Sequence, residues 1–150
     1  MKPQTLIATN TLGMGARPGE IEACKSDPKG WVLSQIRSPA PLSRPYKEAA
    51  TSAALIAATK KNRGRLKKRL LSRQEEEAFS ERRKVLSSFV AHHNRELTLR
   101  HQQAVTSETS FAERWAWFWG NRFTVSARDN HLRMVAGAFE REATRPHIFG

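Results

Sequence analysis

His92, His93 and Glu96, close together in one predicted helix, are of the residue types that bind metal ions. His92 and Glu96 are four residues apart, so on a helix they share a face and could contribute to one site. Two donors are too few for a closed metal site, and the order of residues that zinc proteases carry on a helix is missing. We therefore predict no metal site and no cofactor, and we interpret His93 as a residue of the helix face.

The other patterns that could support catalysis are incomplete. The stretch GMGARPG, residues 13–19, has Pro18 where a dinucleotide-binding loop has its third glycine, and no predicted strand precedes it. No pattern places a histidine and a carboxylate beside a serine. Glu140 and Glu142 are two residues apart on a helix and diverge, which favours surface ion pairs over an acid–base pair. The sequence predicts no catalytic residue and leaves open whether the protein is an enzyme.

The strongest sign of a binding function is the basic run KKNRGRLKKRLLSR, residues 60–73, which contains no acidic residue. On a helix this run would present cations to a phosphate backbone, with an affinity that falls steeply as salt rises. It has no aromatic residue for base stacking and no DNA-reading motif, so an anionic membrane surface and a hydrated face stay open as alternatives. The candidate polyanion-binding residues are Lys60, Lys61, Arg63, Arg65, Lys67, Lys68, Arg69 and Arg73.

Aromatic residues gather in the stretch FAERWAWFW, residues 111–119, which holds three of the four tryptophans. Phe111, Trp115, Phe118 and Trp119 follow one another at helical spacing and share one face. We expect this face to be buried core, packed against apolar stripes at 79–97 and 132–143.

The ends of this aromatic helix are also predicted from local signals. Ser110 and Glu113 have the spacing of a capping box, which predicts a helix that starts at Phe111. Gly120 and Asn121 are residue types that end helices. Asn121 and Arg122 are the remaining polar candidates for a site, and we favour a cap and a surface contact for them.

The elements that position these residues are all predicted to be helices. Residues 1–37 form short helical pieces, and the proline-rich residues 38–45 form a connector. The alanine-rich residues 46–61 favour a helix that Asn62 and Gly64 weaken or end. A longer helical stretch follows to about Gln103. Its buried face is predicted from Phe79, Leu86, Phe89, Val90, His93 and Leu97.

The last helix is predicted from the spacing of Leu132, Val135, Ala136, Phe139 and Ala143, and Pro146 ends it. No long strand pattern and no internal repeat is present. The expected fold is all-α, an irregular helical bundle with one long basic and amphipathic helix and short N-terminal helices. We divide it into the N-terminal helices 1–37, the connector 38–45 and a helical domain 46–150.

Three motifs carry a family resemblance: LGMGARPGE near the start, WFWGNRFTVSA, and AFEREATRPHIFG at the end. They resemble the N-terminal part of the bacterial proteins called domain of unknown function 1800, or DUF1800. The resemblance implies a largely helical, longer protein that continues past Gly150 with further polar motifs, so that this chain would be a fragment and the absent remainder its partner. It implies no known activity. The family pattern has a histidine at the position of Arg122, whose guanidinium removes a potential ligand or general base.

Composition sets the remaining bounds. A chain of 150 residues has room for one domain, its single cysteine, Cys24, excludes an internal disulfide, and its net charge of +12 favours anionic partners. No transmembrane run and no signal peptide is evident, so the expected location is cytoplasmic. The leading functional hypothesis is a helical structural or interaction scaffold. The alternative is a basic helical module that binds nucleic acid or another polyanion non-specifically.

Overall fold

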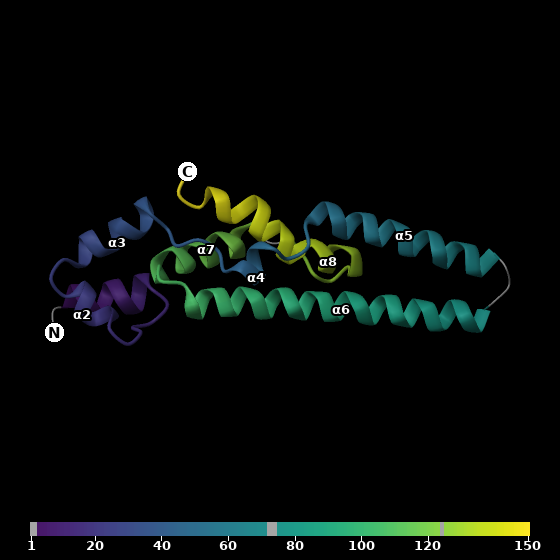
Figure 1. Ribbon diagram of the computed structural model, residues 1–150, viewed down its shortest axis with the longest axis horizontal. Helices are drawn as coiled ribbons and strands as arrows, with labels where there is room; N and C mark the ends of the chain where they lie inside the picture. The colour runs from purple at the N-terminus through teal and green to yellow at the C-terminus, as the bar shows by residue number, and fades with distance from the viewer. Residues whose placement is uncertain (1–2, 72–74, 124) are drawn as a thin grey trace.

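The computed structural model describes residues 3–71, 75–123 and 125–150, and all regular structure in these ranges is helical. The molecule is elongated (Figure 1), and α6 (Glu75–Thr106) runs along most of its length. With 32 residues, α6 is about 48 Å long. Helix α5 (Ser52–Leu71) lies antiparallel beside one end of α6, and the N-terminal helices gather at the other end. The all-α prediction is confirmed for the part of the chain that the structure describes.

Short helical segments form the N-terminal end. They are α1 (Pro3–Leu6), the π-helical η1 (Ile7–Leu12), α2 (Glu20–Cys24) and α3 (Pro28–Arg37). Helix α3 begins at Pro28 because Asp27 accepts a hydrogen bond from the N–H of Gly30 at 2.9 Å and Pro28 occupies the first turn. The Cys24 side chain is fully buried, as expected of a small apolar residue.

The helix predicted for residues 46–61 is wrong at both ends. Tyr46 belongs to the short α4 (Arg44–Lys47), and α5 begins only at Ser52. Helix α5 then continues through Asn62 and Gly64 to Leu71. One glycine in a helix costs about 1 kcal/mol relative to alanine, which the packing of α5 on α6 and α8 outweighs.

The apolar core lies where α5, α6 and α8 (Asn130–Phe139) meet. It consists of Leu55, Phe89, Met134 and Ala138, with Val85, Leu86 and Val135 packed against them. The stripe predicted on α6 is therefore correct at Phe89 and Leu86 but wrong at Phe79, Val90 and Leu97, which are exposed. In the second half of α6 the buried residues are instead Glu96, Leu99 and Gln103. Two of these three are polar, so the buried face does not follow the apolar stripe.

Helix α7 (Ser110–Arg122) buries mainly the face that carries its small residues and Glu113, and the indole nitrogen of Trp117 is buried as well. Its buried residues include Ala112, Glu113 and Ala116, whereas Trp115 and Trp119 are only half-buried. The prediction that the face of Phe111, Trp115, Phe118 and Trp119 is buried core is wrong, because Phe118 is exposed and the other three are only partly buried. The small side chains of Ala112 and Ala116 let the α7 backbone approach its neighbours closely. The carboxylate of Glu113 is buried because it pairs with Arg145.

The chain ends in a continuous run of three helical segments. Helix α8 is followed by the π-helical η2 (Glu140–Thr144) and the 3₁₀-helical η3 (Arg145–His147). Asp129 caps α8, because its Oδ1 accepts from the N–H groups of His131 and Leu132 at 2.8 and 3.1 Å. These hydrogen bonds to the carboxylate lower the pKa of Asp129.

Candidate functional site

A set of buried ion pairs joins α6, α7, η2 and η3 at the centre of the molecule. We call it the ionic network, and its members are Glu96, Arg100, Glu113, Glu140, Arg141 and Arg145. The four members on α6 and η2 form two ion pairs. Arg141 Nη1 lies 2.6 Å from Glu96 Oε2, and Glu140 Oε2 lies 2.7 Å from Arg100 Nε.

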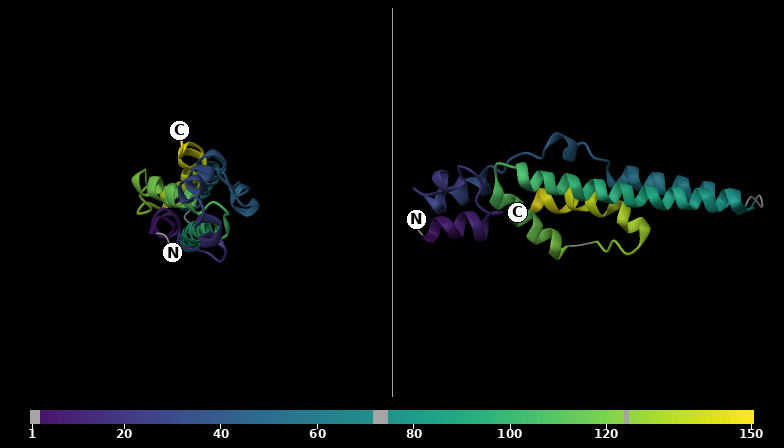
Figure 2. Two further views of the ribbon diagram at one scale, coloured as in Figure 1. Left: turned by 90° about the vertical axis from the view of Figure 1, so that its left-hand side faces the viewer. Right: turned by 90° about the horizontal axis from the view of Figure 1, so that it is seen from below.

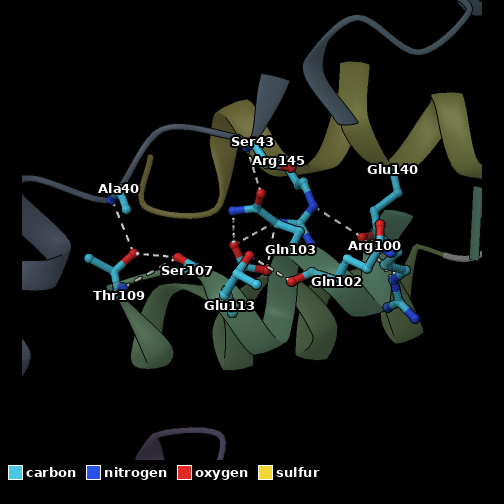
Figure 3. A network of polar contacts seen from close by, with 11 residues as sticks. Ala40, Ser43, Arg100, Gln102, Gln103, Ser107, Thr109, Glu113, Glu140 and Arg145 are labelled. Carbon is cyan, nitrogen blue, oxygen red and sulfur yellow. Dashed lines mark hydrogen bonds and ion pairs between the residues drawn. The ribbon is translucent and has the colours of Figure 1, made fainter. Parts of the chain in front are cut away.

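Arg145 connects two carboxylates of the network (Figure 3). Its Nη1 lies 2.9 Å from Glu113 Oε2 and its Nε lies 3.2 Å from Glu140 Oε1. Burial lowers the pKa of the Arg145 guanidinium, but the carboxylates of Glu113 and Glu140 and the nearby Tyr46 more than offset this and leave the pKa raised. Arg145 is therefore a permanent cation, and it holds α7 against η2 and η3.

The capping box predicted for Ser110 and Glu113 is wrong, because Glu113 contacts Arg145 instead. Ser110 Oγ is buried without a hydrogen-bond partner, and the Glu113 carboxylate accepts from Arg145 Nη1 and from Gln103 Nε2 at 3.1 Å each. A carboxylate that neutralises a buried guanidinium contributes more there than it would as the acceptor of one main-chain amide.

The connector is attached to this network through main-chain amides (Figure 3). The N–H of Ser43 donates to Gln103 Oε1 at 2.7 Å, and the N–H of Ala40 donates to Thr109 Oγ1 at 3.0 Å. Gln103 thereby links the connector to Glu113. The path of the connector across α6 and α7 is fixed by side chains of those helices.

Tyr46 is buried beneath two guanidinium groups. The Cζ atoms of Arg145 and Arg141 lie 5.2 and 5.5 Å from the centre of its ring. Burial raises the pKa of Tyr46 to about 12, although the neighbouring arginines oppose this. The phenol stays protonated at neutral pH and supplies a cation–π surface, so it does not serve as a base there.

A cavity of about 290 Å³ adjoins the network between α6, α7 and α8. Asn121 and His93, both considered from the sequence, line it together with Glu96, Arg100 and Glu140. The two carboxylates in the cavity wall already have guanidinium partners. The cavity therefore presents no free carboxylate pair for acid–base chemistry.

Two glycines make room for these carboxylates. A Cβ atom at Gly137 would lie 2.7 Å from Glu96 Oε2, and one at Gly120 would lie 2.8 Å from Glu140 Oε2. Both distances are shorter than real Cβ contacts allow. The close approach of α8 and α7 to the ionic network depends on these two positions.

His92 stands at the edge of the network. Its Nε2 is buried without a hydrogen-bond partner and lies 3.9 Å from Glu96 Oε1. Burial lowers the pKa of His92 and Arg141 adds to this, while Glu96 opposes it. No group of three or more histidine, cysteine, aspartate and glutamate side chains comes together within the described residues.

The other candidates from the sequence lie apart from the network. Arg122 is exposed, and its Cζ lies 5.6 Å from the ring centre of Phe118. Lys60, Lys61, Arg63, Arg65, Lys67 and Lys68 are exposed on α5, on the hairpin that α5 and α6 form. Arg73 and the side chain of Arg69 lie outside the described residues.

The sequence reasoning missed the ionic network. It assigned Glu140 to surface ion pairs, but the structure buries most of that side chain between Arg100 and Arg145. Glu142 does face outward and accepts from the N–H of Ser52 at 3.0 Å. The available signal was the spacing of Glu96, Arg100 and Gln103, which places a polar stripe on one side of α6.

Comparison with known proteins places the chain in a family. The family model described as protein of unknown function (DUF1800) matches residues 7–150. Neither the curated proteins nor the solved structures give a match. Across the described residues, none of the helices has the length and apolar character needed to cross a bilayer. Because the family match covers nearly all of the sequence, the protein belongs to the DUF1800 family.

Proposed function

We propose that this protein is a helical scaffold, a rigid frame on which further polypeptide of the DUF1800 architecture assembles. The observation that carries the proposal is the pairing of the buried charges. Glu96, Glu113 and Glu140 each contact a guanidinium, so the ionisable groups at the centre of the molecule hold helices in place. No pair of carboxylates is left free for catalysis at this site.

Buried ion pairs suit this role because they specify geometry. Replacing one by apolar residues often leaves stability unchanged, while breaking one leaves an uncompensated charge. Arg145 contacts carboxylates on two different segments at once, and Arg141 also donates to the carbonyl oxygens of Ala49 and Ala50. Alternative packings of α7, η2 and the α4–α5 turn would separate these charges.

Co-expression tests the scaffold proposal. The gene is read past the codon for Gly150, and the segment encoded there is produced with residues 1–150 as two separate polypeptides. We expect the two to co-purify, and we expect Arg145→Met to weaken the complex more than Arg114→Met, since Arg114 is exposed. A reading frame that stops at Gly150, or two polypeptides that do not associate, contradicts the proposal.

The α5 surface supports polyanion binding as a second candidate function. The six described cations of the basic run are all exposed, while Thr59, Asn62 and Leu66 turn inward and line a cavity against α6. The cations thus spread over most of the outer circumference of α5. Such a surface attracts phosphate backbones without reading a sequence.

Heparin and DNA retention tests this second candidate. The charge-reversed variant carries Lys67→Glu, Lys68→Glu and Arg69→Glu, and the matched control reverses Lys29, Arg37 and Lys47, which are exposed elsewhere. We expect salt-sensitive retention that the first variant loses and the control largely keeps. Equal losses in both variants would show that only net charge matters, and retention that ignores salt would also contradict the candidate.

A further inference from the structure

Four large aromatic residues of α7, together with Phe123 and Phe149, form a continuous, partly exposed ridge. We call it the aromatic ridge, and it consists of Phe111, Trp115, Phe118, Trp119, Phe123 and Phe149. Neighbouring ring centres are 4.9 to 6.2 Å apart. Phe118 is 41% exposed and Phe123 is 59% exposed. In the right-hand view of Figure 2, α7 lies at the outer edge of the molecule.

Rings of the ridge stack on one another. The planes of Trp115 and Phe118 differ by 6°, those of Trp119 and Phe123 by 10°, and Phe111 stacks on Trp115 at 17°. A nucleobase binds an aromatic side chain through a free ring face. Because these contacts occupy ring faces, the ridge offers mainly ring edges to a partner, and an apolar environment suits it better than nucleic acid.

The middle of the ridge does not line a cavity. Trp115, Phe118 and Trp119 line none of the cavities described for this molecule, whereas Phe123 and Phe149, at the two ends of the ridge, each line one. A folded protein partner would need a groove complementary to the middle of the ridge, as in recognition of one helix by another surface. The interfacial region of a lipid bilayer is fluid and adapts to an apolar helix face without such a groove.

The charged side chains that α7 exposes beside the ridge are positive. Arg122 follows Trp115 by seven residues and Phe118 by four, so it emerges within the ridge, and Arg114 is exposed beside it. Glu113, the one carboxylate in the sequence of α7, faces inward to Arg145. The exposed face of α7 therefore combines aromatic residues with unscreened arginines.

We propose that the aromatic ridge docks on an anionic membrane surface, with Phe118 and Phe123 in the interfacial region and Arg122 among the headgroup phosphates. Aromatic side chains with interspersed arginine are the composition of helices that lie in the plane of a membrane interface. The net charge of +12 draws the chain towards anionic lipid. The same charge disfavours pairing of the ridge with a second copy, which would also bring Arg122 close to its counterpart.

Vesicle binding tests the proposal on the full 150-residue chain. Vesicles of phosphatidylcholine alone are compared with vesicles that also contain phosphatidylglycerol, and one set carries brominated acyl chains that quench tryptophan at the interface. We expect blue-shifted emission and quenching with phosphatidylglycerol only. Phe118→Ser with Phe123→Ser, or Arg122→Glu alone, should lower partitioning about tenfold. Circular dichroism checks that each variant remains helical.

The matched control reverses the charge of Lys67 and Lys68 on α5 and leaves the ridge intact. It should slow or weaken binding modestly and keep the bromine quenching. Quenching lost only in the α5 variant would show that α5 meets the membrane and would overturn the proposal. So would unchanged partitioning of the ridge variants, a dimer in sedimentation equilibrium that the ridge variants abolish, or ridge-dependent binding to single-stranded DNA without vesicle binding.

Discussion

Arg141 Nη1 and Glu96 Oε2 lie 2.6 Å apart, with only 5% and 4% of the two side chains exposed. The second terminal nitrogen of the same guanidinium donates to the carbonyl oxygens of Ala50 at 2.6 Å and Ala49 at 3.3 Å. One side chain of η2 thus binds α6 and the turn before α5. This junction therefore joins three separate segments of the fold.

Arg141→Met tests how much this junction contributes to the stability of the fold. The substitution keeps an unbranched apolar side chain but leaves the Glu96 carboxylate and two carbonyl groups buried without their donor. We expect the free energy of unfolding to fall by about 3–5 kcal/mol. Urea denaturation measures the change, and Arg114→Met at the surface, expected to alter stability by less than about 0.5 kcal/mol, is its control. An equal effect of the two substitutions would contradict the assigned role of Arg141.

Gly137→Ala tests the space that Glu96 requires. The added Cβ would lie 2.7 Å from both the Cβ and the Oε2 of Glu96, on the neighbouring helix, so α8 must move away from α6. We expect destabilisation by roughly 1–3 kcal/mol. Gly64→Ala on α5 meets no atom within 4 Å and should instead stabilise the protein by roughly 0.5–1 kcal/mol. Thermal unfolding of both variants would show opposite signs, and the same sign in both would argue against this packing.

His92→Gln tests how the network responds to pH. Because the pKa of His92 is lower in the folded protein than its ordinary value of 6.5, the unfolded chain binds more protons as pH falls. The contribution of His92 to stability is complete above pH 6.5 and is lost progressively below it. We expect the stability advantage of the unmodified protein over the variant to be constant above about pH 7.5 and to shrink at lower pH. An advantage that grows as pH falls would mean that Glu96 dominates over burial at His92.

Phe89→Ala and Phe118→Ala compare the apolar core with the aromatic ridge. Phe89 is 3% exposed and packs between α5 and α8, so its removal should cost about 3–5 kcal/mol. Phe118 mainly loses its ring contacts with Trp115 and Trp119, about 1 kcal/mol. Denaturant unfolding of the two variants separates these expectations. A larger loss of stability for Phe118→Ala than for Phe89→Ala would mean that the aromatic face of α7 belongs to the core, as the sequence indicated.

Some helix ends follow from local signals in the sequence. Asp27 and Asp129 are of a residue type that caps helices, and they cap α3 and α8, since each cap depends on a few neighbouring amides. The bounds of the long helices were less predictable. Gly64 has an intrinsic preference against helix, but its effect is small beside the tertiary contacts that hold α5. The division into residues 1–37, 38–45 and 46–150 stays a prediction.

The burial of polar residues could not be predicted from hydrophobic periodicity. That method assigns Trp115 to the interior and Glu113 to the surface, whereas the structure leaves Trp115 half-buried and buries Glu113. Periodicity ranks residues by their cost of burial alone, whereas the cost for Glu113 is offset by Arg145, 32 residues later in the chain. Such a pairing is a property of the fold, so the sequence identifies its members only after the helices have been placed.

The connector meets its helices through the amides of Ala40 and Ser43. Every residue except proline supplies such a donor, so the course of this segment tolerates almost any change in its own side chains at these two positions. The information that routes it resides instead in Gln103 and Thr109. Side-chain changes at Ala40 and Ser43 should therefore leave the course of the connector unchanged, whereas loss of the acceptor oxygens of Gln103 or Thr109 should alter it.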